Sequence, residues 1–199
     1  MEYKIKPKPT KYNGVQFRSR LEAKWAAFFD ILKWPWLYEP VDLGEWSPDF
    51  IISGAATLLV EVKPILQFHE ETAGKVERGV GVWGKMHVGE WVDGLLLGIG
   101  PRYDDPCGPS IGWLTESFFN IKEDPDQWGV DWGNGMFGCW VDKNPSGRTG
   151  ICHDTQSFRD RISGGYDGGC FGEKRLDLRP EIEAAWALAT NKVQWHKGK

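Results

Sequence analysis

The chain contains Ser47-Pro48-Asp49-Phe50 and then Glu61-Val62-Lys63, with eleven residues between Asp49 and Glu61. The first stretch predicts the start of one β-strand, and the second lies on the strand that follows it. Side chains alternate between the two faces of a strand, so we expect Glu61 and Lys63 on one face and Val62 in the core. Two carboxylates and an ammonium group that converge on one place need a charged occupant, and a divalent cation with a phosphate suits them. The two stretches therefore predict a nuclease active site.

The residues around these stretches resemble a known family. The matching segments are Phe17-Arg18-Ser19-Arg20-Leu21-Glu22, Tyr38-Glu39-Pro40, Pro48-Asp49-Phe50 and Val60-Glu61-Val62-Lys63. In this order they resemble the PD-(D/E)XK nuclease superfamily, and most closely its phage-type Holliday-junction-resolving endonucleases and the nuclease subunits of some transposases. The resemblance covers roughly residues 10 to 100 and does not extend over the second half. It implies a metal-dependent DNA endonuclease of phage or mobile-element origin that hydrolyses phosphodiester bonds in branched or structured DNA.

The resemblance also implies a role for each residue of the predicted site. The family places a glutamate on a first helix, an aspartate at P-D and the E-x-K triplet on the next strand, and Glu22, Asp49, Glu61 and Lys63 match these positions. Asp49 and Glu61, with the backbone carbonyl of Val62, would bind Mg²⁺ or Mn²⁺ through oxygen ligands, and Glu22 would complete the metal site. Lys63 would lie beside the attacking water and the scissile phosphate. Any one of these residues taken alone would favour an ordinary surface ion pair.

Basic residues gather at the N-terminal end of the chain. Residues 1–34 carry eight Lys and Arg against three Asp and Glu, a net charge of +5, whereas the whole chain has a net charge of −4. This asymmetry is typical of a protein that contacts phosphates on one side only, although a solvated terminus would give it too. The predicted DNA-binding residues are the two arginines before Glu22 and the lysines of the arm: Arg18, Arg20, Lys4, Lys6, Lys8 and Lys11.

The hydrophobic pattern predicts an α/β fold built from a helix, a mixed central sheet and a crossover helix, and the resemblance implies that this is a restriction-endonuclease-like core. Predicted helices run from Ser19 toward Pro35, from His69 to Arg78 and from Glu181 to Asn191, and a turn is expected at Asn13-Gly14. Predicted strands are 36–39, 49–52, 58–63, 93–99, 111–114 and 136–141. We expect residues 1–105 to form the nuclease core with its basic arm, and residues 106–199 to form a Gly- and Trp-rich elaboration that packs on the core and ends in a helix.

Composition narrows the cellular setting and the cofactors. The sequence has no apolar run near the ~20 residues that a membrane span requires, and no signal-peptide pattern. Four cysteines, Cys107, Cys139, Cys152 and Cys170, do not form a dense disulfide framework, so we expect an intracellular, cytoplasmic protein. A zinc site from Cys139, Cys152, His153 and Cys170 is not expected, because the spacing contains no C-x2-C pair. DNA is the expected partner, and a homodimer is left open.

Two further patterns favour ordinary structure over function. Gly79-Val80-Gly81-Val82-Trp83-Gly84 spells G-x-G-x-x-G, but it follows a charged helical segment and lacks the strand-turn-helix context of a dinucleotide site. His69 follows the predicted active strand, where a surface role and a contact with the site both stay open. Two other functions also stay open: a duplex-cutting nuclease subunit that needs a partner, and a non-cleaving nucleic-acid-binding or virion protein that kept the fold.

Overall fold

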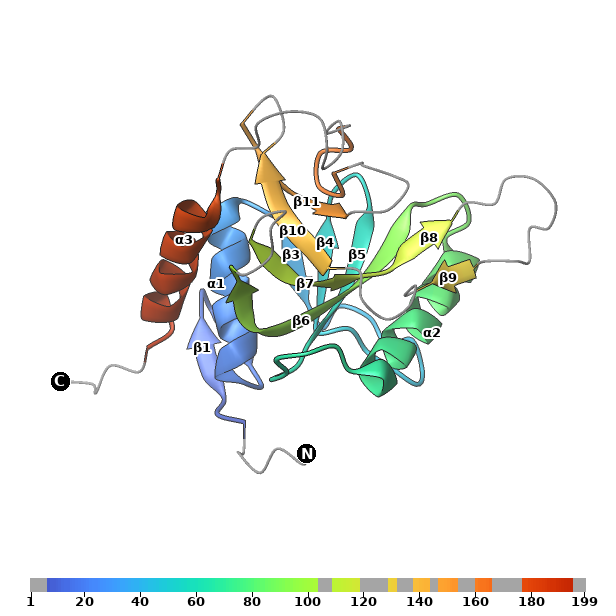
Figure 1. Ribbon diagram of the computed structural model, residues 1–199. Helices are drawn as coiled ribbons and strands as arrows, with labels where there is room; N and C mark the ends of the chain where they lie inside the picture. The colour runs from blue at the N-terminus through green and yellow to red at the C-terminus, as the bar shows by residue number, and fades with distance from the viewer. Residues whose placement is uncertain are drawn as a thin grey trace.

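A seven-stranded mixed sheet forms the centre of the molecule in the computed structural model (Figure 1). The structure describes residues 7–103, 109–118, 129–131, 138–143, 147–153, 160–165 and 177–194. The strands of the sheet are β3 (Trp36–Tyr38), β4 (Phe50–Ser53), β5 (Thr57–Val62), β6 (Val92–Arg102), β7 (Ser110–Leu114), β10 (Gly138–Lys143) and β11 (Thr149–His153). Their order is β11-β10-β7-β6-β5-β4-β3, and β5 and β6 are parallel whereas the other neighbours are antiparallel.

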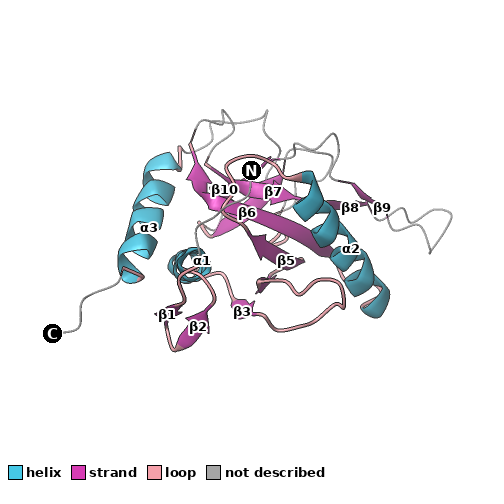
Figure 2. Ribbon diagram, turned by 90° about the horizontal axis from the view of Figure 1, so that it is seen from below, coloured by secondary structure: helices cyan, strands magenta, loops and turns pink. Residues whose placement is uncertain are grey.

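In the described residues, three helices cover the two faces of this sheet: α1 (Arg20–Leu32), α2 (Glu70–Met86) and α3 (Arg179–Lys192). Figure 2 shows α1 and α3 side by side, with α2 on the other side of the strands. The alternation along β5 explains this, because Leu58 and Val60 pack with α1 and α3 whereas Leu59 packs with α2. The predicted α/β class with a mixed sheet is confirmed. In the described part of the chain, no helix has the length and apolarity needed to cross a membrane.

Two short antiparallel ribbons lie outside the main sheet. β1 (Thr10–Tyr12) and β2 (Val15–Phe17) form one of them, and β8 (Glu116–Phe118) and β9 (Gly129–Asp131) form the other. The turn of the first ribbon is at Asn13-Gly14, as predicted, with φ of 47° and 83°. Positive φ at both central residues is the geometry of a two-residue hairpin turn, and Asn followed by Gly adopts it readily.

Helix α1 begins and ends where its sequence signals predict. Ser19 caps the N-terminus, because its side-chain oxygen accepts the backbone N–H of Glu22 at 3.1 Å. At the other end Lys33 adopts a left-handed conformation, with φ of 60°, two residues before Pro35. Between these caps the helix buries its aromatic face, including Trp25, against the sheet. Glu22 is thereby placed in the first turn of α1, at the end that faces the candidate site.

Helix α2 is longer than predicted, and the prediction that it ends at Arg78 is wrong. It runs to Met86, and the segment that spells G-x-G-x-x-G, residues 79–84, is helical throughout. Glycine disfavours a helix interior by about 1 kcal/mol relative to alanine, which is why the pattern predicted an end here. Packing reverses that preference: a Cβ at Gly79 would overlap the indole ring of Trp46. His69 caps the start of α2 by accepting the N–H of Thr72.

Strands from the second half of the chain extend the central sheet. The predicted domain boundary at residue 105 falls between β6 and β7, which are paired neighbours in the sheet. The segment 160–165 is fixed to the first half by a buried ion pair, in which Arg161 Nε lies 3.1 Å from Asp93 Oδ2. The side chains of Arg161 and Asp93 are 1% and 0% exposed, and the guanidinium of Arg161 stacks over the ring of Trp91. The two halves therefore share one structural framework.

This buried pair yields a stability prediction. Arg161→Met should lower the free energy of unfolding by roughly 3–5 kcal/mol, because it leaves the Asp93 carboxylate buried without its cation. The double variant Asp93→Asn/Arg161→Met should lose less than the sum of the two single variants. Urea unfolding of all three variants measures this, with Lys192→Met on the exposed face of α3 as the control. A loss below about 1 kcal/mol for Arg161→Met would contradict the structural role of the pair.

Candidate active site

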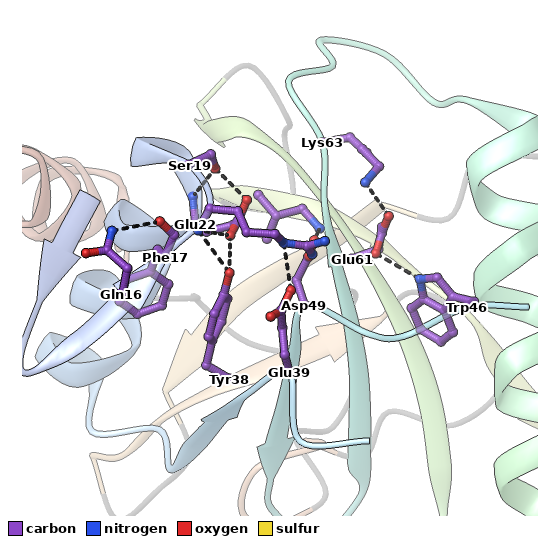
Figure 3. Close-up of polar contacts among 12 residues, drawn as sticks. Gln16, Phe17, Ser19, Glu22, Tyr38, Glu39, Trp46, Asp49, Glu61 and Lys63 are labelled. Atoms are coloured by element: carbon purple, nitrogen blue, oxygen red, sulfur yellow. Dashed lines mark hydrogen bonds and ion pairs between the residues drawn. The ribbon is translucent and has the colours of Figure 1, made fainter. Parts of the chain in front are cut away.

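The E-x-K triplet has the predicted arrangement. Lys63 Nζ lies 2.5 Å from Glu61 Oε1, so both side chains are on the same side of the chain, whereas Val62 is part of the core on the α1 side (Figure 3). Glu61 is 6% exposed and belongs to the side of β5 that faces α2. Burial lowers the pKa of Lys63, but the charge and hydrogen bond of Glu61 raise it more, so the net shift is upward. Lys63 is thus held as a cation beside a buried carboxylate.

Asp49 is tied to the same strand as Glu61. It precedes β4, is 2% exposed, and its Oδ2 accepts the backbone N–H of Val62 at 2.8 Å. Burial and then the charge of Glu61 raise the pKa of Asp49 to about 7, against the opposing effects of the Val62 N–H and Lys63. Two carboxylates that face each other away from water cannot both ionise without cost. The structure therefore brings Asp49, Glu61 and Lys63 together, as the sequence pattern predicts.

Trp46 is a contributor that the sequence analysis missed. Its indole N–H donates to Glu61 Oε2 at 2.8 Å, and the side chain is 8% exposed (Figure 3). The ring is held in place by Gly79 of α2, where any side chain would overlap it. One oxygen of Glu61 therefore faces Lys63 and the other faces Trp46, which fixes the orientation of the carboxylate. The available signal was a tryptophan three residues before Asp49, and that alone does not reveal its partner.

Glu22 lies on the other side of Asp49, and Arg18 links the two, because its backbone N–H donates to Glu22 Oε2 at 3.2 Å while its guanidinium contacts Asp49 (Figure 3). Ser19 donates its hydroxyl to Glu22 Oε1 at 2.6 Å, and Tyr38 donates its hydroxyl to Glu22 Oε2 at 2.6 Å. Burial and this hydrogen bond raise the pKa of Tyr38 to about 12, so it stays a donor. Glu22 is near enough to contribute to the upward shift of the Asp49 pKa. Its carboxylate oxygens, however, are turned toward α1 and β3 and away from Glu61.

Arg18 forms ion pairs with acidic residues of the site, although it was predicted to bind DNA phosphates. Its Nη2 lies 2.5 Å from Asp49 Oδ1, and its Nε lies 2.6 Å from Glu39 Oε1. Glu39 itself has φ of 43°, an uncommon value for a residue other than glycine. Glu39 is therefore an ion-pair partner of Arg18.

The other predicted DNA-binding residues are spread over several places. Arg20 is half-buried, and its Nε forms no hydrogen bond. The pKa of Lys24 is lowered, first by burial of Lys24 and then by the charge of Arg20. Lys8 and Lys11 are exposed at the β1–β2 hairpin, beside α1. Lys4 and Lys6 lie outside the described residues. The structure therefore does not gather these residues around Asp49 and Glu61, and Arg18 alone of the described ones contacts the site.

The carboxylate oxygens of the site are the kind of ligand that a hard cation prefers, but the present hydrogen bonds of Glu22 hold it away from such an ion. All candidate side-chain ligands are oxygen donors, as Mg²⁺ and Mn²⁺ prefer. Burial and then the charge of Glu61 raise the pKa of Asp49, and a bound cation would favour the charged form of both carboxylates. As they stand, no three His, Cys, Asp or Glu side chains in the described ranges are grouped closely enough to hold a metal ion. Asp49 and Glu61 therefore fit as ligands, whereas Glu22 would first have to turn away from Ser19 and Tyr38.

Cys139 and Cys152, the two cysteines among the described residues, are not placed to bind one zinc ion together. In the pairing of β10 with β11, Cys139 is opposite His153 and Cys152 is opposite Trp140, so Cys139 and Cys152 belong to opposite faces of the sheet. Both are buried, and burial raises the pKa of the Cys139 thiol to about 12, which opposes its ligation as a thiolate. Cys107 and Cys170 lie outside the described residues.

Comparisons with known proteins add no family assignment. No protein-family model matches this chain, nor does any curated protein or solved structure.

The buried carboxylate pair predicts a pH dependence of stability. The pKa of Asp49 is 3.8 ordinarily and about 7 in the fold, so between these values the folded protein holds a proton that the unfolded chain has lost. The free energy of unfolding of the metal-free protein should therefore fall as pH rises from about 4 to about 7, by a few kcal/mol at most. Asp49→Asn should remove much of this fall.

Thermal unfolding of both proteins in chelator at acidic and mildly alkaline pH measures this difference. Asp177→Asn, which changes an exposed aspartate at the start of α3, is the matched control and should leave the slope unchanged. If wild-type protein and Asp49→Asn show the same change of stability with pH, the raised pKa is wrong.

Proposed function

We propose that this chain is a metal-dependent DNA endonuclease of the PD-(D/E)XK type. One observation carries the proposal: Lys63 and Glu61 pair at 2.5 Å on one face of β5, beside the buried Asp49. This is the constellation that the sequence resemblance requires. The order of elements supports it as well, because α1 carries Glu22, the β3–β4–β5 meander carries Asp49 and Glu61, and α2 crosses over to the parallel strand β6. The same order is that of a restriction-endonuclease-like core.

The roles of the side chains follow from their contacts. Asp49 and Glu61 would hold Mg²⁺ or Mn²⁺, with the Val62 carbonyl and Glu22 as further ligands that the resemblance implies. When bound, the ion supplies Lewis-acid polarisation of the phosphate and a lower pKa for a coordinated water. Lys63 holds its proton beside Glu61, so it can stabilise negative charge that develops on the phosphate. Trp46 fixes the plane of the Glu61 carboxylate through its N–H.

The finer parts of the proposal rest on the sequence resemblance alone. These are branched or structured DNA as the substrate, phage or mobile-element origin, action in the cytoplasm and a homodimer. Each stays a prediction. Incubation of the purified protein with labelled linear, nicked, single-stranded and four-way-junction DNA, with and without Mg²⁺, tests the substrate directly. If the protein cleaves none of these DNA substrates, that result contradicts the proposed function.

Substitution of the paired residues tests the site. Glu61→Gln and Lys63→Met should each lower the cleavage rate by about 10²–10⁴-fold, because each removes stabilisation of the transition state while conserving side-chain size. Glu181→Gln and Lys143→Met are the matched controls, because these residues form an ion pair of 2.6 Å between α3 and β10. The controls should cut at the wild-type rate. Wild-type cleavage by Glu61→Gln would overturn the assignment.

The choice of metal is a separate prediction. Activity should require Mg²⁺ or Mn²⁺ and should be lost in chelator, because the ligands are carboxylate oxygens. Ca²⁺ can fill such a site but tolerates looser geometry and polarises water less, so it should permit DNA binding and suppress cleavage. Gel assays in each metal, with binding followed in parallel, measure both effects. Cleavage in Ca²⁺ that equals cleavage in Mg²⁺ would contradict the mechanism.

A further inference from the structure

Helix α2 presents a stripe of cations to solvent. Lys75, Arg78 and Lys85 are exposed and share one face of the helix with Val82, at spacings of three and four residues. The opposite face, including Val76 and Val80, is buried against the sheet. At 1.5 Å per residue, the ten residues from Lys75 to Lys85 span about 15 Å. The stripe therefore offers three positive charges along a line rather than at a single point.

A groove lies along this stripe. It has a volume of about 330 Å³ and runs between α2 and the loop before Asp49, and its lining includes the three cations, Glu45 and Trp46. The charges of the stripe are not locked in buried pairs. Arg78 lies 3.4 Å from Glu45, and Lys75 lies 3.4 Å from Glu71, but all four side chains are largely exposed. Exposed ion pairs contribute about 0–1 kcal/mol, so phosphate oxygens can replace their carboxylates at little cost.

The groove borders the candidate active site at Trp46. Trp46 lines the groove and donates its N–H to Glu61, so the wall of the groove contacts the catalytic carboxylate directly. The groove is also on the α2 side of the sheet, the side to which Glu61 belongs. Lys75 is in the N-terminal half of α2, which follows β5 in the chain, and Lys85 is near the C-terminal end. Along the chain, Lys75 is therefore the residue of the stripe nearest to Glu61 and Lys63, and Lys85 is the farthest.

The basic residues at the N-terminus are placed differently. Lys11 lies on β1 and Lys8 lies just before it, and β1 packs beside α1. Helix α2 covers the other face of the sheet (Figures 1 and 2). The guanidinium of Arg18 already faces Asp49 and Glu39. Among the described cations, those of α2 therefore combine exposure, linear spacing and continuity with Glu61.

We propose that the groove along α2 binds the sugar–phosphate backbone of duplex DNA next to the bond that is cut. The inference rests on the proposed function and names the surface that holds its substrate. Lys75, Arg78 and Lys85 contact successive phosphates without reading bases, so the contacts position the DNA and do not select its sequence. Each contact releases condensed counterions, which makes binding dependent on salt.

The test compares three charge-neutralised variants. Lys75→Gln/Arg78→Gln/Lys85→Gln removes the stripe, Lys8→Gln/Lys11→Gln removes the described cations of the arm, and Lys33→Gln/Arg148→Gln/Lys192→Gln removes three exposed cations elsewhere. Binding of a fluorescein-labelled DNA duplex is measured by anisotropy in Ca²⁺ between about 50 and about 200 mM salt. The stripe variant should bind at least about tenfold more weakly at low salt. The slope of its log affinity against log salt concentration should be less negative than that of the wild type by about two to three. The other two variants should stay near wild type.

A second readout separates binding from chemistry. In Mg²⁺, the stripe variant should show a raised KM and a nearly unchanged kcat, because no residue of the stripe belongs to the Asp49–Glu61–Lys63 site. The proposal would be overturned if the stripe variant had the same salt slope as the wild type. It would also be overturned if the variant Lys33→Gln/Arg148→Gln/Lys192→Gln lost as much affinity as the stripe variant, or if the wild-type protein did not bind duplex DNA at low salt. A loss confined to single-stranded RNA, with duplex DNA binding intact, would also overturn it. Absence of cleavage by the wild-type protein rejects the proposed function instead, because the binding comparison does not depend on cleavage.

Discussion

Asp49 and Glu61 are both buried on neighbouring strands, and burial makes the negative charge of each carboxylate costly. The surrounding residues offset that cost with matched donors. Asp49 receives the Val62 N–H and the Arg18 guanidinium, and Glu61 receives Lys63 and the Trp46 N–H. These four donors depend on different parts of the fold. The Val62 N–H depends on the register of β4 against β5, Arg18 on the segment before α1, Lys63 on the end of β5, and Trp46 on its packing against Gly79 of α2. Together they reduce the cost of burying two carboxylates close together, and the raised pKa of Asp49 reflects the part of that cost that remains.

The seat of Trp46 explains features of α2 that its helix propensity does not. A helix with several glycines is disfavoured in isolation, by about 1 kcal/mol for each relative to alanine. Gly79 admits the indole ring, and Gly94 of β6 lets α2 approach closely, because a Cβ there would meet Val76 and Val80. One side of α2 thus packs closely on the sheet at Gly94, and Trp46 packs against α2 at Gly79. Packing against these partners supplies the stability that the glycines remove.

Much of this arrangement follows from local sequence rules, and the exceptions have physical causes. The Asn13-Gly14 turn, the Ser19 cap and the common face of Glu61 and Lys63 depend on neighbours within a few residues, so the pattern predicts them. The length of α2 was underestimated because Gly79 packs against Trp46, which is far away in the chain. The pairing of β6 with β7 also depends on contacts between separate segments of the chain, which a local pattern does not show. Likewise, a basic residue in a sequence does not show whether its partner will be a phosphate or a carboxylate.

Arg18 illustrates that last point and bears on how the protein would handle its substrate. Its guanidinium lies between Asp49, which is buried, and Glu39, which is held at a left-handed φ that costs roughly 1–2 kcal/mol for a residue with a Cβ. The Glu39 N–H donates to the Asp49 carbonyl at 3.0 Å, so the end of β3 and the start of β4 keep both carboxylates on Arg18. A phosphate that approached Arg18 would compete with two fixed anions. At α2 it would compete only with exposed ones, so on the proposed function the strands provide the chemistry and α2 provides the attraction.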